Sequence, residues 1–159
     1  MRALTKTFAV LATILLAGPA LAGEAVPINA TFGIQWTPVD WSNPYGRITE
    51  SLGAAGLPNG KVLSIYSQDS LDAVNGRITS DFVAIAFSDT DVVYVKYENI
   101  PAVYYPATNT ASFSGPVTVL GGEGRFDGAT GKLSIRTTIR FSPLPVGTFD
   151  IKGVIKTAD

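Results

Sequence analysis

The chain has 159 residues, a formal net charge of −1, and neither cysteine nor histidine. Without these two residue types there is no thiol nucleophile, no Ser–His–Asp triad, no iron–sulfur cluster and no zinc site built on Cys or His. The near-neutral charge, with no block of basic residues, argues against nucleic acid as a partner. The sequence predicts no cofactor and no metal site, so any chemistry would use carboxylates, tyrosine, lysine, arginine or the backbone.

The first residues have the pattern of a targeting segment. Arg2 and Lys6 accompany an apolar run over residues 8–16, and Ala20-Leu21-Ala22 matches the small-residue cleavage pattern. The apolar run is too short to span a bilayer, so we expect no membrane anchor. The sequence therefore predicts a signal peptide over residues 1–22 and an exported protein, periplasmic or extracellular, with a single domain over residues 23–159.

Beyond this segment the hydrophobic pattern has the period of β-strands. Apolar and polar residues alternate over residues 28–36, 111–119, 133–141 and 149–155. Clusters of proline and glycine separate these runs, and we find no amphipathic helix. About seven to nine strands at this spacing indicate an all-β domain, either a barrel or a sandwich, with no helices after the signal peptide.

Two segments in the middle of the chain are apolar on both faces. Residues 82–87 and 92–95 are joined by Ser88-Asp89-Thr90-Asp91, which predicts a hairpin turn. A strand that is buried on both faces needs a second covering layer. That layer could be another copy of the chain, or the loops predicted around residues 51–58 could fold over this face.

A glycine-rich segment precedes the last two predicted strands. Its glycines are Gly121, Gly122, Gly124, Gly128 and Gly131. It is not a phosphate loop, because Gly131-Lys132 is followed by Leu133, and a strand follows where a dinucleotide site needs a helix. The glycines therefore indicate a bulged corner between strands, with Phe126 in the core and Arg125 facing outward or paired with a carboxylate.

The segment "GGEGRFDGATG", after "FSGPVTVL" and before "GTFDIKGVIK", resembles the C-terminal half of allene oxide cyclase-like barrels, which are related in fold to dirigent proteins. The resemblance covers residues 111–156. It implies a single eight-stranded antiparallel β-barrel with a lumen open at one end, and a homo-oligomer, often a trimer. The N-terminal half does not resemble the catalytic part of either group, and the chain lacks the cysteine that plant cyclases use. No catalytic residue is therefore transferred.

Three functions are compatible with these patterns. The first is binding of a small apolar or aromatic ligand in the barrel lumen, because small barrels can enclose one ligand. The second is a cyclase or isomerase that steers a reactive intermediate by shape. The third is a structural envelope or surface protein.

Four polar residues lie in or beside apolar strands, where a polar group is costly to bury. Glu98 and Asp81 are the candidate catalytic carboxylates, and Tyr97 and Tyr105 are the candidate ligand-binding residues. The competing interpretation is that the tyrosines are packing residues and the carboxylates are solvated.

Overall fold

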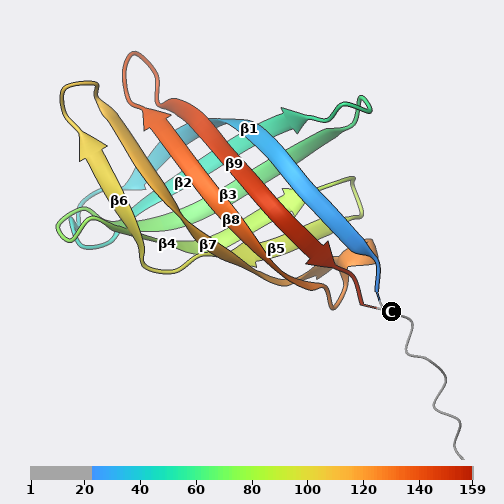
Figure 1. Ribbon diagram of the computed structural model, residues 1–159. Coiled ribbons are helices and arrows are strands. Elements are labelled where there is room, and N and C mark those ends of the chain that lie inside the picture. The colour runs from blue at the N-terminus through green and yellow to red at the C-terminus, as the bar shows by residue number, and fades with distance from the viewer. Residues whose placement is uncertain (1–22, 159) are drawn as a thin grey trace, which may run out of the picture.

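A computed structural model describes residues 23–158, so the predicted signal peptide, residues 1–22, lies outside the described residues. Within these described residues, nine strands follow one another (Figure 1). They are β1 (Ala25–Asp40), β2 (Arg47–Gly56), β3 (Val62–Asp72), β4 (Arg77–Ala86), β5 (Val92–Lys96), β6 (Ile100–Tyr105), β7 (Thr110–Glu123), β8 (Thr130–Arg140) and β9 (Val146–Lys156).

The strands close into one antiparallel barrel. The order β3-β2-β1-β9-β8-β7-β5-β4-β6 is completed by pairings of β3 with β4 and of β7 with β6. Strands β5 and β6 share one position, because β4 and β7 each pair with both of them. The prediction of an eight-stranded antiparallel barrel is therefore confirmed, with one of the eight positions filled by two short strands.

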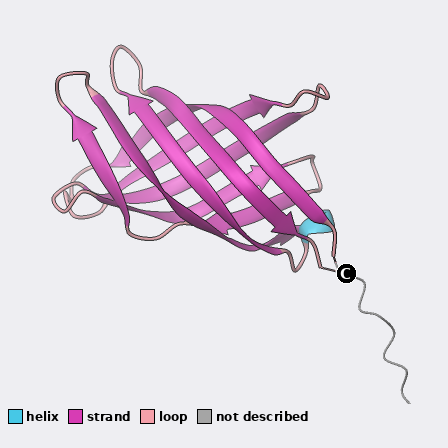
Figure 2. Ribbon diagram, viewed as in Figure 1, coloured by secondary structure: helices cyan, strands magenta, loops and turns pink. Residues whose placement is uncertain are grey.

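Helix is almost absent from residues 23–158. The one helical element among them is a single 3-10 turn, η1 (Gly124–Phe126), which lies between β7 and β8 (Figure 2). No helix in the described part of the chain is long and apolar enough to cross a membrane.

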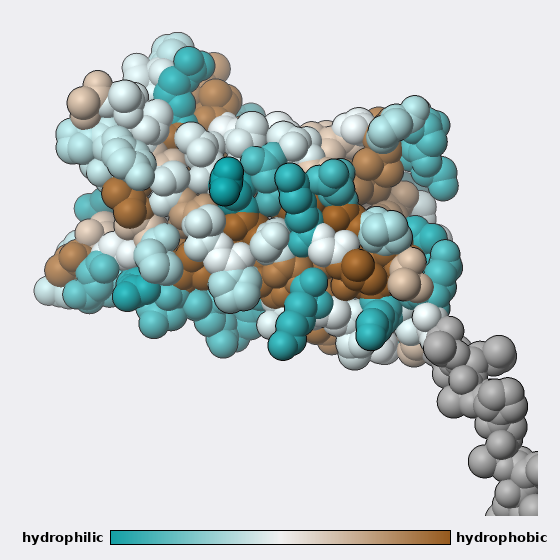
Figure 3. Space-filling model, in the orientation of Figure 1, coloured by the Kyte–Doolittle hydropathy of each residue, from teal (hydrophilic) through white to brown (hydrophobic). Residues whose placement is uncertain are grey.

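Strand alternation creates the barrel interior. In β1 the residues at every second position from Ile28 to Trp36 are buried, while their neighbours are exposed. Phe32 lies opposite Phe149 of β9. The ring centroids of Phe113 and Phe149 are 6.2 Å apart. These aromatic rings pack in the middle of the barrel. On the outer face of β1, β8 and β9, hydrophilic side chains project into solvent and hydrophobic side chains are visible between them (Figure 3).

The glycine-rich segment closes the end of the barrel where the described chain begins and ends (Figure 1). Phe126 is fully buried, and its ring lies 4.8 Å from that of Phe87. Arg125 is exposed and pairs with Asp91 at 3.5 Å. Both predictions for this segment, Phe126 in the core and Arg125 outside or paired, are confirmed.

The outer face of the middle strands carries an aromatic cluster formed by Tyr66, Phe82 and Tyr94, with centroid distances of 6.1 and 5.5 Å. The prediction that loops near residues 51–58 cover this face is wrong. Residues 51–56 belong to β2 and pair with β3 as part of the barrel wall, and Phe82 remains 44% exposed. Coverage by another copy of the chain stays a prediction.

Candidate functional site

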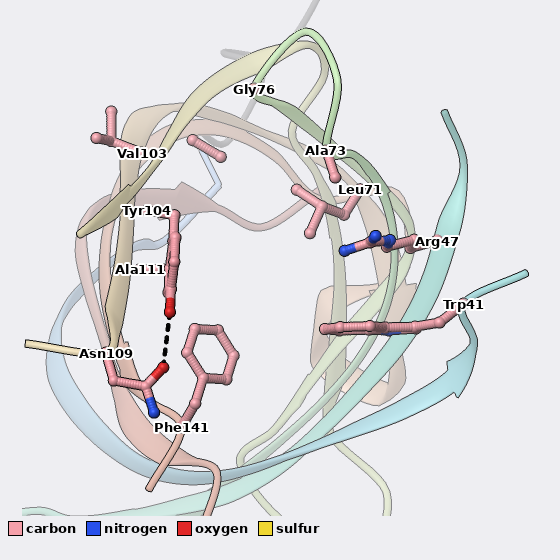
Figure 4. Close-up of a pocket in the computed structure, with 11 residues that line it drawn as sticks. Trp41, Arg47, Leu71, Ala73, Gly76, Val103, Tyr104, Asn109, Ala111 and Phe141 are labelled. Atoms are coloured by element: carbon pink, nitrogen blue, oxygen red, sulfur yellow. Dashed lines mark hydrogen bonds between the residues drawn. The ribbon is translucent and has the colours of Figure 1, made fainter. Parts of the chain in front are cut away.

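The end of the barrel opposite the glycine-rich segment opens into a pocket of about 550 Å³ (Figure 4). Its lining comes from strand ends and turns that are far apart in the sequence. The lining residues are Trp41, Arg47, Leu71, Ala73, Gly76, Ala102, Val103, Tyr104, Asn109, Ala111 and Phe141. The lining is mainly apolar, with polar groups from only a few side chains, which is typical of a small-molecule site.

In each strand every second side chain points into the barrel, and this pattern continues to the strand ends at the rim. Leu71 follows the buried Asp69 by one inward step on β3, and Arg47 precedes the buried Thr49 by one inward step on β2. In the same way Phe141 follows the buried Ile139. Because antiparallel strands alternate in direction, the start of β2 and the ends of β3 and β8 meet at the same end of the barrel.

Aromatic contacts hold the pocket wall in place. Trp36, which is buried, contacts both Trp41 and Phe141 edge to face, with centroids 5.5 and 5.2 Å apart. Tyr104 lies 6.0 Å from Phe141, and its hydroxyl donates a hydrogen bond of 2.8 Å to Asn109 Oδ1. The wall is thus preformed, which lowers the entropic cost of ordering it around a ligand.

One charged side chain enters this apolar pocket. The guanidinium of Arg47 projects into the opening between Leu71 and Trp41 (Figure 4), with Cζ 4.6 Å from the centroid of the Trp41 ring. Arg47 Nε is buried and has no hydrogen-bond partner. Within residues 23–158 no carboxylate pairs with Arg47.

Beneath the pocket lies a buried carboxylate that the sequence reasoning missed. Asp69 is 1% exposed, and it accepts hydrogen bonds from Tyr97 Oη at 2.5 Å and from Ser67 Oγ at 2.9 Å. Burial raises the pKa of the Asp69 carboxyl to about 7, although both hydrogen bonds oppose that change. Burial and the nearby Asp69 raise the pKa of the Tyr97 hydroxyl well above its usual value.

The polar layer around Asp69 extends to neighbouring strands. The backbone N–H of Tyr97 donates to Ser80 Oγ at 2.9 Å, which fixes β4 against the break between β5 and β6. Ser51 Oγ and Thr137 Oγ1 are buried without a hydrogen-bond partner. With Asp69 and Tyr97 each 1% exposed, this layer is sealed from the pocket above it.

The two predicted catalytic carboxylates lie on the outside of the barrel, so the expectation that they occupy costly positions is wrong. Asp81 is the extra residue of a bulge, since Gln68 pairs with Phe82 and Asp69 pairs with Ser80. The bulge turns Asp81 outward, where it accepts a hydrogen bond of 2.7 Å from Ser70. Glu98 lies in the break between β5 and β6, with its side chain 68% exposed and paired with Lys96.

The two predicted ligand-binding tyrosines are also outside the pocket. Tyr97 is buried in the polar layer described above, and Tyr105 is 47% exposed at the end of β6. The adjacent Tyr104 lines the pocket instead. The structure therefore does not bring Glu98, Asp81, Tyr97 and Tyr105 together in one site.

Some signals for the missed residues are present in the sequence. Ser67 and Asp69 continue the inward alternation of Leu63 and Ile65, so they are polar residues on an apolar face. Phe141 likewise continues the alternation of β8. Trp41 and Asn109 have no such signal, because they lie in turns whose position depends on barrel closure.

No group of three or more carboxylate side chains that could hold a metal ion occurs in residues 23–158. Comparisons of the chain with family models, with curated proteins and with solved structures give no match.

Proposed function

We propose that this protein binds a small apolar or aromatic molecule in the pocket at the open end of the barrel. The observation that carries the proposal is a preformed space of about 550 Å³ walled by Trp41, Tyr104 and Phe141. Pockets of about 300–1,000 Å³ with mainly apolar walls are typical of sites for small ligands. The middle of the barrel is packed with aromatic side chains, so the ligand would occupy the mouth rather than the whole lumen.

Turnover is the second candidate function, and Asp69 is the observation that favours it. A carboxyl whose pKa is near 7 can donate or accept a proton at neutral pH, as an isomerase or cyclase requires. However, Asp69 is hydrogen-bonded to Tyr97 and Ser67 and is sealed beneath the pocket. Binding therefore ranks ahead of catalysis.

Membership of the allene oxide cyclase-like group, export and a homotrimer stay predictions. A structural role at the envelope or surface is the third candidate, and it would be favoured if no ligand binds.

The test is fluorescence titration of the protein with N-phenyl-1-naphthylamine, a neutral dye that brightens in apolar sites. Both tryptophans of the chain, Trp36 and Trp41, lie at the mouth, so a dye bound there quenches intrinsic fluorescence by energy transfer. Dye that brightens without quenching tryptophan would place the binding elsewhere and overturn the proposal. Absence of any binding by this dye and by unrelated apolar dyes would overturn it as well.

A pocket-filling variant makes the test specific. Ala111→Trp places a large ring in the pocket, and we expect at least tenfold weaker dye binding with unchanged far-ultraviolet circular dichroism. The control is Ala107→Trp, which adds the same ring at an exposed position in the turn between β6 and β7 at the same end. Equal affinities of the two variants for the dye would contradict the proposal.

A further inference from the structure

Arg47 is the feature of the pocket that apolar binding alone does not explain. Its guanidinium lies over the Trp41 ring at 4.6 Å and points into the pocket space (Figure 4). Its Nε is buried without a hydrogen-bond partner, and no ion pair to it occurs within residues 23–158. A guanidinium is positively charged and offers only N–H donors, so it needs acceptors.

A partly buried, unpaired guanidinium is costly unless it finds an acceptor. The guanidinium carbon lies 4.6 Å from the centroid of the Trp41 ring, and a guanidinium presents N–H donors in a fork that fits a carboxylate. The neighbours of Arg47 in the pocket, Leu71 and Ala73, offer no acidic side chain. Residues 23–158 therefore supply no carboxylate to this guanidinium, which leaves its outward N–H donors for a ligand.

We infer that the ligand is an anionic amphiphile, an apolar or aromatic body bearing a carboxylate, and that the carboxylate binds Arg47. The body would lie against Trp41, Phe141 and Tyr104, and the carboxylate would take two N–H donors of the guanidinium. This inference rests on the proposed function and names the ligand class of that same pocket.

The opposite side of the pocket supports this orientation of the ligand. Tyr104 and Asn109 face Arg47 across the opening (Figure 4), and the Tyr104 hydroxyl is already engaged by Asn109 Oδ1. The remaining walls are aliphatic or aromatic. An anionic group would therefore be recognised on the Arg47 side, and the apolar body would fill the other side.

The experiment compares two matched probes, 1-naphthylacetate and its neutral amide 1-naphthylacetamide. The affinity of each probe is measured by its displacement of N-phenyl-1-naphthylamine from the purified protein. We expect the acid to bind at least tenfold more tightly than the amide, since hydrogen bonds to charged groups are the stronger ones. In Arg47→Gln this preference should disappear, so that the acid and the amide bind with equal affinity. Arg47→Lys keeps the charge without the fork and should keep only part of the preference.

The control variant is Arg140→Gln. Arg140 is exposed on the outer face at the end of β8, near the same opening, so its removal changes the net charge by the same amount without touching the pocket. This variant should keep the full preference for the acid. A preference that survives in Arg47→Gln, or that is lost equally in Arg140→Gln, would overturn the role of Arg47.

The two levels of the proposal fail in distinguishable ways. Binding of the dye with equal displacement by acid and amide would overturn the anionic ligand and leave the apolar pocket standing. Absence of dye binding and of binding by either naphthyl probe in calorimetry would overturn both. Thermal unfolding of each variant shows whether the barrel is intact, and if Arg47→Gln does not fold, Arg47→Met supplies the same comparison.

Discussion

The two ends of the barrel use the same kind of pair, an arginine over an aromatic ring, with opposite results. At the closed end Arg125 lies 4.7 Å from the centroid of Phe126 and pairs with Asp91 at 3.5 Å. At the open end Arg47 lies 4.6 Å from the centroid of Trp41 and has no carboxylate partner among the described residues. The closed end is packed and its arginine is paired with a carboxylate. The open end has a cavity, and its arginine is unpaired among the described residues. This difference between the two ends is the basis for proposing the ligand site at the open end.

One connection fills the closed end of the barrel. The connection from β7 to β8 is long enough to turn inward and bury Phe126 and Ala129. It reverses at Gly124, where φ is +62° and an added Cβ would collide with the backbone carbonyl oxygen of Thr90, so only glycine fits. At the open end the turn between β6 and β7 is short and stays at the rim, with Asn109 N–H donating to the Pro106 carbonyl.

Substitution of the ring that fills the closed end should have the largest effect. Phe126 is fully buried, so Phe126→Ala should lower the free energy of unfolding by about 3–5 kcal/mol. Phe141→Ala at the open end removes a ring that already borders a cavity, and we expect a loss of about 1–2 kcal/mol. Urea unfolding of the two variants measures both quantities. Equal losses would show that the two ends are packed alike.

The layer beneath the open end should make stability depend on pH. Folded Asp69 keeps its proton up to about pH 7, whereas in the unfolded chain the carboxyl loses it near pH 3.8. The contribution of this group to stability is therefore complete below about pH 4 and falls as pH rises toward 7, by up to about 4 kcal/mol.

Asp69→Asn removes this titration while keeping an acceptor for the Tyr97 hydroxyl. We expect the stability of the variant relative to the original protein to rise steadily between pH 4 and pH 7 in urea unfolding. A difference that is constant over this range would mean that Asp69 titrates normally. Taking the difference cancels the exposed carboxyls, such as Asp72, whose pKa is lowered by hydrogen bonds from Asn75.

The smallest expected effect is on the free energy of unfolding when each of the two arginines is replaced by methionine. Arg47→Met and Arg125→Met each lose a stack on an aromatic ring, but only Arg125 also loses an ion pair. Arg47→Met should raise the free energy of unfolding by about 1 kcal/mol, because a buried donor without a partner is removed. Arg125→Met should lower it by at most about 1 kcal/mol, since the Asp91 pair is partly exposed. Losses of the same size in both variants would show that Arg47 is satisfied within the chain.

Much of the fold could be predicted because strand alternation is a local property. Ile28, Phe32, Ile135 and Ile151 all occupy the inward positions that period-two spacing gives them. The glycine-rich segment was equally informative, since sharp turns at positive φ nearly always need glycine. Phe126, the one large apolar residue in that segment, could therefore be placed in the core.

The candidate site was mostly beyond this reasoning. The bulge at Asp81 shifts the register of β4 by one residue, and a simple alternating pattern does not reveal where such a shift occurs. Glu98 lies in the break between β5, which ends at Lys96, and β6, which begins at Ile100. This break is so short that the sequence pattern does not reveal it. The structure shows that this carboxylate faces solvent, in a break where β4 and β7 each pair with both short strands.

Local sequence was therefore enough for the strands, the inward faces and the conformation of the glycine corner, because backbone geometry and burial pattern act over a few neighbouring residues. The pocket and its unpaired Arg47 required closure of the barrel. Trp41, Arg47, Leu71 and Phe141 lie far apart along the chain and meet only when the start of one strand and the ends of others converge at one rim. Whether a charge finds a partner depends on that convergence, which is a property of the packed structure.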